Sequence, residues 1–282
     1  MGRRLSSRLV VNHLATALCG AMVLVALIPL LSLLWLVVSK GVGGLSLGFF
    51  IHRPVPVGEA GGGVGPAIVG TFTMVGMACV VALPIGVGTG VYLAEHGARP
   101  FARGVRFLAE VLSGVPSIVL GVVAYAMLVV PMKRFSALAG AVALSLVMIP
   151  PLARSTEEFV RLVPPSLREA SLALGVPAWR TSLKVVLRTA LGGIATAALL
   201  AVARGAGETA PLLFTALNNQ YWSLRPDQPM ASLTVQIYNY AISPYESWHE
   251  QAWSAALVLL LLVGLLNLGA RLALRDRVGG RR

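Results

Sequence analysis

The sequence predicts an all-α, polytopic membrane protein with six transmembrane helices. The chain has 282 residues, of which 56% are hydrophobic and only 12% are charged. Its mean hydropathy of +0.79 is too high for a water-soluble domain of this length. Six apolar segments have or approach the roughly 20 residues that an α-helix needs to cross a bilayer. The expected spans are 14–38, 67–93, 107–130, 137–152, 190–214 and 252–270.

The segments outside the spans are too short to form a soluble domain. They comprise a tail at 1–13, a long loop at 153–189, a second long loop at 215–251 and a basic tail at 271–282. The first span is about twice as long as the apolar core of a signal peptide, so we expect it to be retained. The fourth span is short and reaches Pro150 and Pro151, which leaves its end undefined.

The charge distribution predicts the topology. Of the 23 Lys and Arg residues, 17 lie in the two tails and in the connections on the same side of the predicted spans, and five lie on the opposite side. The positive-inside rule therefore places both termini in the cytoplasm and predicts an inner-membrane protein with both termini inside. Because most of the net charge of +12 is explained by topology, we expect membrane lipid, and no nucleic acid, as a partner.

The sequence contains no motif for a disulfide framework, a metal site or enzymatic catalysis. Cys19 and Cys79 both lie in apolar runs, so neither a disulfide framework nor a metal site is expected. The sequence contains no P-loop, no H-E-x-x-H motif and no nucleophile elbow. We therefore expect no enzymatic activity and no cofactor in this chain; if its function is driven by ATP, then ATP and Mg would act in a separate subunit.

A short helix is predicted within the loop 153–189. Ser166 and Glu169 have the spacing of a capping box, and Gly175 is suited to end the helix in the left-handed conformation. One mildly apolar face carries the residues Leu167, Ala170, Ser171 and Leu174. Two interpretations remain open: a connector packed under the bundle, and a surface that docks into a partner.

Two opposite charges lie inside the fifth predicted span. Arg204 and Glu208 are four residues apart, and an ion at the centre of a bilayer costs roughly 2.5 to 3.5 kcal/mol on insertion scales. The pair is either a structural ion pair that fixes helix packing or part of a substrate pathway. Gly205, Gly207 and Pro211 lower the helix propensity there, as expected where the backbone lies beside a cavity or a moving joint.

The chemistry of these two side chains suits a protonated oxyanion. Arg204 offers a planar set of N–H donors that matches two oxygens of a tetrahedral anion. Glu208 can accept a hydrogen bond from the P–OH group of phosphate, which sulfate lacks at neutral pH. Thr209 is a weaker candidate because such hydroxyls usually bond to the preceding helical turn. Glu110, near the end of the third span, is more simply explained by snorkelling or by a loop arginine.

Two stretches resemble a known family. Residues 169–175 resemble the EAA loop of ABC importer permeases, with Ser171 in place of the second alanine. Residues 204–223 are similar to the signature of a permease subunit of phosphate-specific ABC importers, and Glu208 is followed by Thr-Ala-Pro-Leu as in that subunit. The resemblance implies a type I importer bundle with a cytoplasmic coupling helix, and it carries Arg204 and Glu208 over as intramembrane charged positions. The implied ATPase-docking residues are Leu167, Glu169, Ala170, Ser171, Leu174 and Gly175; the implied pathway residues are Arg204, Glu208 and Thr209.

The partners implied by the resemblance are a sister permease, two copies of an ATP-binding subunit and a periplasmic phosphate-binding protein. Two alternatives stay open. An ion-coupled secondary phosphate carrier would need no ATPase, and a sensor or scaffold subunit would bind the same partners without transport. In the outer loop, Leu233 and Ile237 have helical spacing and predict an amphipathic helix within 230–241, which is either a lid on the bundle or a docking surface.

Overall fold

The chain is built from α-helices, as the sequence predicts. The computed structural model describes the backbone of residues 2–59 and 61–279 and the side chains of 11–59, 61–269 and 272, and these residues include no β-strand. The two predicted tails thus lie largely outside the described side chains, while their described backbone continues the first and last helices. The helices are α1 Gly2–Gly41, α2 Leu47–Ile51, α3 Gly65–His96, α4 Pro100–Gly114, α5 Ser117–Ala124, α6 Val130–Met132, α7 Ala137–Arg161, α8 Pro165–Ala173, α9 Ala178–Arg180, α10 Leu187–Gly207, α11 Ala210–Thr215, α12 Leu233–Ala241 and α13 Glu246–Gly279.

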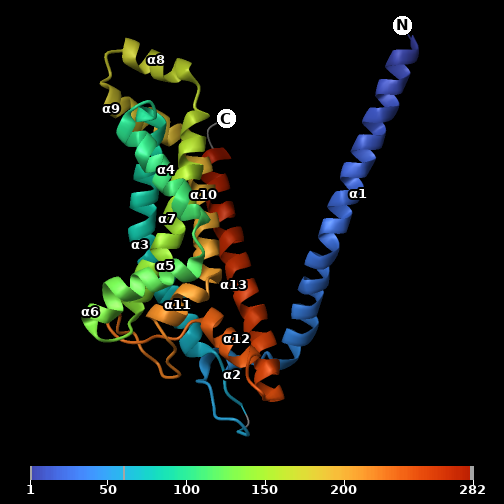
Figure 1. Cartoon of the computed structure of the whole chain (residues 1–282), viewed down its shortest axis with the longest axis vertical. Helices are drawn as coiled ribbons and strands as arrows, with labels where there is room; N and C mark the ends of the chain where they lie inside the picture. The colour runs from blue at the N-terminus through green and yellow to red at the C-terminus, as the bar shows by residue number, and fades with distance from the viewer. Residues whose placement is uncertain (1, 60, 280–282) are drawn as a thin grey trace.

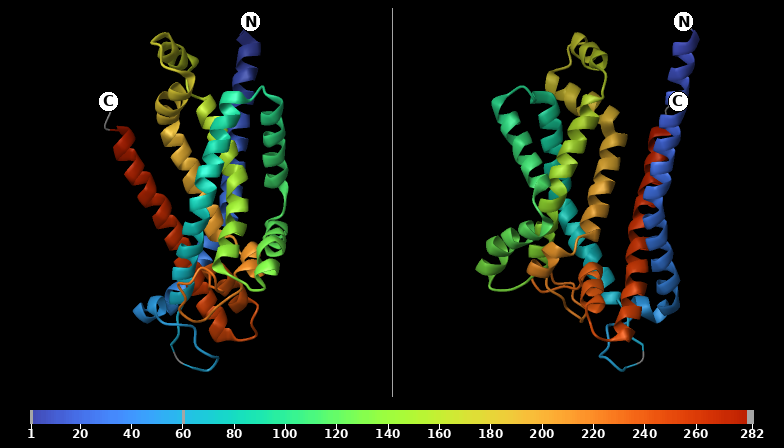
Figure 2. Two further views of the ribbon diagram at one scale, coloured as in Figure 1. Left: turned by 90° about the vertical axis from the view of Figure 1, so that its left-hand side faces the viewer. Right: turned by 45° about the vertical axis from the view of Figure 1, so that its right-hand side comes forward.

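The long helices run roughly side by side and define two ends of the molecule (Figure 1). One end carries α8, and we call it the α8 end; the opposite end carries α2 and α12, and we call it the α12 end (Figures 1 and 2). Among the described residues, five helices are long and apolar enough to span a membrane, and the number is six if a bent helix pair is counted as one span.

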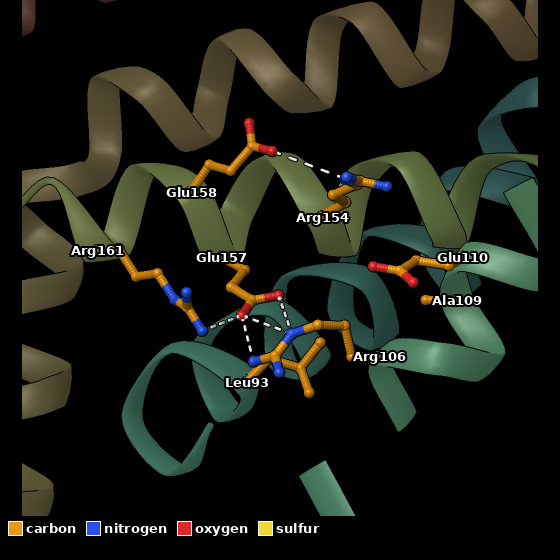
Figure 3. A pocket seen from close by; sticks show the side chains of 8 residues that line it. All are labelled: Leu93, Arg106, Ala109, Glu110, Arg154, Glu157, Glu158 and Arg161. Carbon is orange, nitrogen blue, oxygen red and sulfur yellow. Dashed lines mark hydrogen bonds and ion pairs between the residues drawn. The ribbon is translucent and has the colours of Figure 1, made fainter. Parts of the chain in front are cut away.

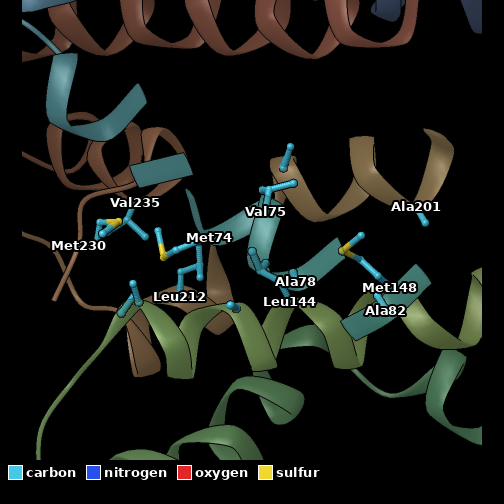
Figure 4. Close-up of a cluster of buried hydrophobic side chains, with 14 of the residues drawn as sticks. Met74, Val75, Ala78, Ala82, Leu144, Met148, Ala201, Leu212, Met230 and Val235 are labelled. Atoms are coloured by element: carbon cyan, nitrogen blue, oxygen red, sulfur yellow. The ribbon is translucent and has the colours of Figure 1, made fainter. Parts of the chain in front are cut away.

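The centre of the bundle is the α3–α7 pair, which packs closely because small residues face each other. A side chain at Gly86 would collide with Leu152, and one at Gly90 would lie 2.5 Å from the Ala153 carbonyl. The buried cluster around this seam includes Met74, Leu144 and Met148 (Figure 4). Small residues thus allow the two backbones to approach, as in other membrane helix pairs.

The fourth span does not end at its prolines. α7 continues through Pro150 and Pro151 to Arg161, because its packing against α3 and α10 outweighs the low helix propensity of proline. Ser136 begins this helix by accepting a hydrogen bond from the backbone N–H of Ala139 (3.1 Å).

The third span is bent where the sequence predicts an uninterrupted segment. The axes of α4 and the helix that follows from Ser117 to Met132 differ by 106°. Val115 precedes Pro116 and has an extended backbone (ψ 132°), which is the conformation that a following proline favours. The bend leaves α4 beside α7 at the α8 end and turns α5 towards α11.

The first helix stands apart from the rest of the bundle. α1 is almost wholly exposed along its apolar length and meets the bundle at the α12 end, where Ser254 of α13 donates a hydrogen bond to the Gly41 carbonyl (2.9 Å; Figure 1). Its apolar surface is therefore exposed in the isolated chain, although the helix has the composition of a membrane span.

Candidate functional site

The fifth predicted span is broken at the position of its acidic residue. α10 ends at Gly207, Glu208 has an extended backbone (φ −76°, ψ 129°), and α11 begins at Ala210. Pro211 has no N–H to bond to the carbonyl of Gly207, so a continuous helix would lose a hydrogen bond there. The two charges therefore lie on either side of the end of α10 and do not share one uninterrupted helix.

Neighbouring helices hold the break in place. The carbonyl of Glu208, which no longer has a helical donor, accepts a hydrogen bond from the buried Thr234 hydroxyl of α12 (3.0 Å). On the other side, α5 packs so closely on α11 that a side chain at Gly121 would lie 2.6 Å from the Cα of Pro211. The backbone polar group is thus satisfied by tertiary contacts, as a membrane interior requires.

Arg204 and Glu208 are paired only loosely. Arg204 Nε lies 3.6 Å from Glu208 Oε1, and the side chains are 54% and 17% exposed, respectively. The guanidinium also borders a cavity of about 40 Å³ next to the α4–α5 bend, which has the size for water and not for a larger ligand. In this chain, then, the arginine is neither sealed in apolar protein nor locked to its carboxylate.

Thr209 initiates α11 through its backbone. Its carbonyl accepts hydrogen bonds from the N–H groups of Leu212 (3.1 Å) and Leu213 (3.3 Å), and its side chain makes no capping hydrogen bond. The assignment of Thr209 to a substrate pathway remains a prediction.

The predicted docking helix exists, but its first turn differs from the expectation. α8 begins after Pro164, so Ser166 lies within the helix, and the predicted capping box of Ser166 and Glu169 is wrong. The fixed φ of Pro165 already suits the first helical position. Gly175 has a φ of +76°, which confirms the expected left-handed end of the helix.

The predicted docking face is divided by the structure. Leu167, Glu169, Ala170 and Leu174 are exposed, together with Gly175. Ser171 is instead buried, and its hydroxyl hydrogen-bonds to that of Thr181 (2.8 Å). The assignment of Ser171 to the exposed docking face therefore has to be corrected, because its side chain attaches α8 to the following segment.

Arg168 forms the second attachment of α8. Its guanidinium pairs with Glu95 in the last turn of α3 and donates to the Val160 carbonyl in α7 (3.2 Å). Glu95 also accepts a hydrogen bond from the hydroxyl of Ser182 (3.0 Å). Neither Glu95 nor Ser182 was singled out from the sequence, since their partners lie 73 and 87 residues away along the chain.

A denser ion cluster lies at the same end, between α4 and α7. Glu157 pairs with Arg106 and with Arg161, at 2.6 Å in both cases (Figure 3). The side chain of Glu157 is 8% exposed, against 29% for Arg106 and 53% for Arg161. Gly97 makes room for this arrangement, because a Cβ there would lie 3.0 Å from the Nη2 atoms of both arginines.

No sequence pattern singled out this cluster as a whole. The spacing of Glu157 and Arg161 was a readable signal of a helical ion pair, but Arg106 lies 51 residues from Glu157. Glu110 and the three residues of the cluster line one cavity of about 160 Å³ (Figure 3). Glu110 lies near Arg106 on α4, and its snorkelling or pairing with a loop arginine stays a prediction. Among the described residues, no three His, Cys, Asp or Glu side chains converge as metal ligands would.

Ion pairs also stabilise the loop between α11 and α12. Asp227 accepts two hydrogen bonds from Arg225 (3.2 and 3.1 Å) and lies 3.3 Å from Arg134. The hydrogen bonds from Arg225, together with the positive charges, lower the pKa of Asp227 below its ordinary value. The predicted helix in this loop is confirmed as α12, which begins after Ser232 and packs on α13 and α3.

Comparisons with known proteins give a consistent result. Residues 86–277 match the family described as binding-protein-dependent transport system inner membrane component. The chain is 43% identical to the phosphate transport system permease protein PstA of Yersinia pestis over 92% of this chain and 88% of that protein. It is 40% identical to PstA 1 of Mycobacterium tuberculosis (strain H37Rv) over 93% of this chain and 87% of that protein.

A solved structure has the same fold. The inward-facing MetNI methionine ABC transporter superposes with a TM-score of 0.59, covering 76% of this chain and 93% of that chain. At 23% identity, this likeness concerns the arrangement of the helices alone. It confirms the prediction of a type I importer permease bundle.

Proposed function

The chain belongs to the PstA family of ABC importer permeases, and from this premise we propose that it carries inorganic phosphate across the inner membrane into the cell. Transport is driven by ATP hydrolysis in a separate subunit. The observation that supports a phosphate pathway is the loose Arg204–Glu208 pair at the break between α10 and α11, where the arginine side chain is more than half exposed.

The two side chains provide complementary contacts for hydrogen phosphate. The guanidinium of Arg204 donates two parallel hydrogen bonds to phosphate oxygens. Glu208 is released from Arg204 as phosphate arrives and accepts the P–OH proton in a hydrogen bond, which a fully deprotonated oxyanion cannot donate. Thr209, next to the break, is the third residue of the proposed pathway.

A permease of this class works with an ATPase and a substrate-binding protein. We propose in particular a PstC-like sister permease, two copies of a PstB-like ATPase that bind ATP and Mg, and a PstS-like phosphate-binding protein. The exposed surface formed by Leu167, Glu169 and Ala170 of α8 and by Leu174 and Gly175 just after it enters a cleft of the ATPase. The α8 end and both termini then face the cytoplasm, in agreement with the distribution of Lys and Arg.

Uptake by the reconstituted complex tests this function. Proteoliposomes that contain the permease pair and the ATPase should accumulate radioactive phosphate when both ATP and the binding protein are supplied. Uptake driven by a proton or sodium gradient without the ATPase would support the secondary-carrier alternative. Binding of the partners without any uptake would support a sensor or scaffold subunit.

A charge on α8 tests the docking surface. Ala170→Glu places a bulky anion in the middle of the exposed face, so we expect at least a tenfold loss of both ATPase co-purification and uptake, or about 1.4 kcal/mol of binding free energy. Ala98→Glu, at another exposed position of the α8 end, is the matched control and should behave like the wild type. Unchanged co-purification and uptake in Ala170→Glu would show that the ATPase binds elsewhere.

A further inference from the structure

The docking helix α8 is attached to the membrane bundle at few points. Most of its side chains are exposed, and among the described residues its side-chain hydrogen bonds to the rest of the chain come from Arg168 and Ser171. Ser171 bonds only to the segment that immediately follows α8. Arg168 is therefore the side chain that connects α8 to the long helices α3 and α7.

The carboxylate of Glu95 links three segments: α3, α8 and the segment before α10. One carboxylate oxygen accepts a hydrogen bond from Arg168 of α8. The other accepts one from Ser182, which lies in the segment that directly precedes α10. Glu95 itself belongs to the last turn of α3 and is partly buried, as is Arg168. Charge-assisted hydrogen bonds of this kind are shorter and stronger than neutral ones, and partial burial reduces their screening.

The opposite end of α3 contacts the segment that holds the broken helix. The Thr71 hydroxyl accepts a hydrogen bond from the Leu233 N–H in the first turn of α12 (2.9 Å). The next residue, Thr234, donates its hydroxyl to the carbonyl of Glu208 (3.0 Å). Thr71 and Glu95 are 24 residues apart on one helix, which corresponds to about 36 Å at 1.5 Å per residue.

α3 runs as one helix from Gly65 to His96, through Pro84. It packs tightly on α7, because a Cβ at Gly86 would lie 2.8 Å from the Leu152 side chain and one at Gly90 would lie 2.5 Å from the Ala153 carbonyl. A tightly packed helix transmits a shift at one end and does not absorb it locally. The same helix thus touches the docking segment at the α8 end and the support of Glu208 at the α12 end.

We propose that Glu95 is a positioning residue for transport: it transmits the displacement of α8 to α3, and through Thr71 and α12 to the helix break at Glu208. This inference rests on the proposed docking of an ATPase on α8. Glu95 does not touch the substrate. When Glu95 loses its charge, the ATPase still docks and hydrolyses ATP, but the displacement of α8 moves the helix break at Glu208 less.

The test measures phosphate transported per ATP hydrolysed by the complete importer in proteoliposomes. In Glu95→Gln the side chain keeps its shape and loses its charge, so this ratio should fall about tenfold, within the 5- to 150-fold range of coupling effects. ATPase co-purification and the rate of ATP hydrolysis should stay within about twofold of the wild type. A ratio within about twofold of the wild type would overturn the proposal.

Glu158→Gln is the matched control. Glu158 pairs with Arg154 at the same end of the bundle, but within α7 and on an exposed surface (3.7 Å), so its loss should leave the ratio unchanged. In the double variant Glu95→Gln/Arg168→Gln, the ratio of phosphate transported to ATP hydrolysed should be no lower than in Arg168→Gln alone. The reason is that each single substitution already removes the same Glu95–Arg168 ion pair. Additive losses would contradict a shared role.

A milder variant covers the case in which Glu95→Gln does not assemble. Ser182→Ala removes one donor to Glu95 and keeps the ion pair with Arg168, so the ratio should fall about threefold. An unchanged ratio in this variant would also overturn the proposal. Failure of the proposed function is seen separately: either the wild-type complex does not transport phosphate, or Ala170→Glu still binds the ATPase normally.

Discussion

The Arg204–Glu208 pair and the Arg106–Glu157–Arg161 cluster combine the same types of side chain in different geometries. At the helix break, the closest atoms are 3.6 Å apart and the arginine is mostly exposed. In the cluster, Glu157 is nearly buried and lies 2.6 Å from each of two guanidinium groups. The first pair joins α10 to the break, whereas the cluster joins α4 to α7.

This difference in distance and burial indicates that the Arg204–Glu208 pair can be replaced by other contacts, whereas the Arg106–Glu157–Arg161 cluster is a lasting structural contact. A buried carboxylate between two arginines is expensive to leave without partners, so the cluster keeps its contacts while neighbouring parts move. A pair at 3.6 Å with a half-exposed arginine contributes little to stability, and this arginine can exchange the carboxylate for another anion. Distance and burial, more than residue type, therefore favour the proposal that Arg204, and not Arg106 or Arg161, contacts the anion.

The largest effect is expected when the replaceable pair loses its arginine. In Arg204→Ala, phosphate uptake should fall about 100-fold or more, because two charge-assisted hydrogen bonds to the anion are lost. Assembly and thermal stability should stay close to the wild type, since the pair is loose. Uptake by reconstituted complexes and their melting temperature are the two measurements.

Arg154→Ala is the control for this variant. The Arg154–Glu158 pair has the same sequence spacing, a similar distance of 3.7 Å and a similarly exposed arginine. It lies at the α8 end, away from the break, so its loss should not affect uptake. Normal uptake in Arg204→Ala would remove the proposed anion contact.

The opposite pattern is expected in the cluster. Glu157→Gln leaves two arginines without their shared carboxylate, and the free energy of unfolding should fall by about 1 to 3 kcal/mol, a value reduced for the partial exposure of the arginines. Uptake per assembled complex should remain within about twofold of the wild type. Thermal melting in detergent and uptake normalised to assembled protein are the readouts, and a loss of uptake without a loss of stability would reverse our distinction.

A smaller effect is expected from the acidic partner at the break. Glu208→Gln replaces an acceptor of the P–OH proton by a side chain that can also donate to a deprotonated oxygen. The preference for phosphate over sulfate should therefore fall about tenfold, the equivalent of one hydrogen bond. Competition binding of the two anions to the purified permease pair measures this ratio, and an unchanged preference would assign the selectivity to other groups.

Much of the fold could be predicted from local sequence, because a membrane span is specified by its own composition. Hydropathy located α3 and α13, and Pro116 gave a local reason for the extended Val115. The continuation of α7 through Pro150 and Pro151 could not be predicted, since packing against other helices decides it. Composition also did not predict burial: α1 qualifies as a span but is almost fully exposed, whereas α7 is mostly buried.

The candidate site was predictable to the extent that its residues are close in sequence. Arg204 and Glu208 are four residues apart, and the glycines and Pro211 around them indicated a low helix propensity, although the sequence predicted one continuous span there and not the break at Glu208. The burial of Ser171 depends on Thr181, which the helical periodicity of α8 does not include. The contacts of Glu95 and Arg106 join helices that are distant in sequence, so a single chain without a structure gives no signal for them.

The interruption between α10 and α11 has a mechanical consequence. Arg204 is fixed to the body of α10, while Glu208 lies on a linker whose backbone carbonyl is bound by a side chain of α12. A small rotation about the linker dihedrals changes the separation of the two charges without breaking any hydrogen bond inside either helix. The electric field between Arg204 and Glu208 can therefore be altered by backbone rotation at Glu208 and Thr209. The free energy required is far below that of unwinding a helical turn.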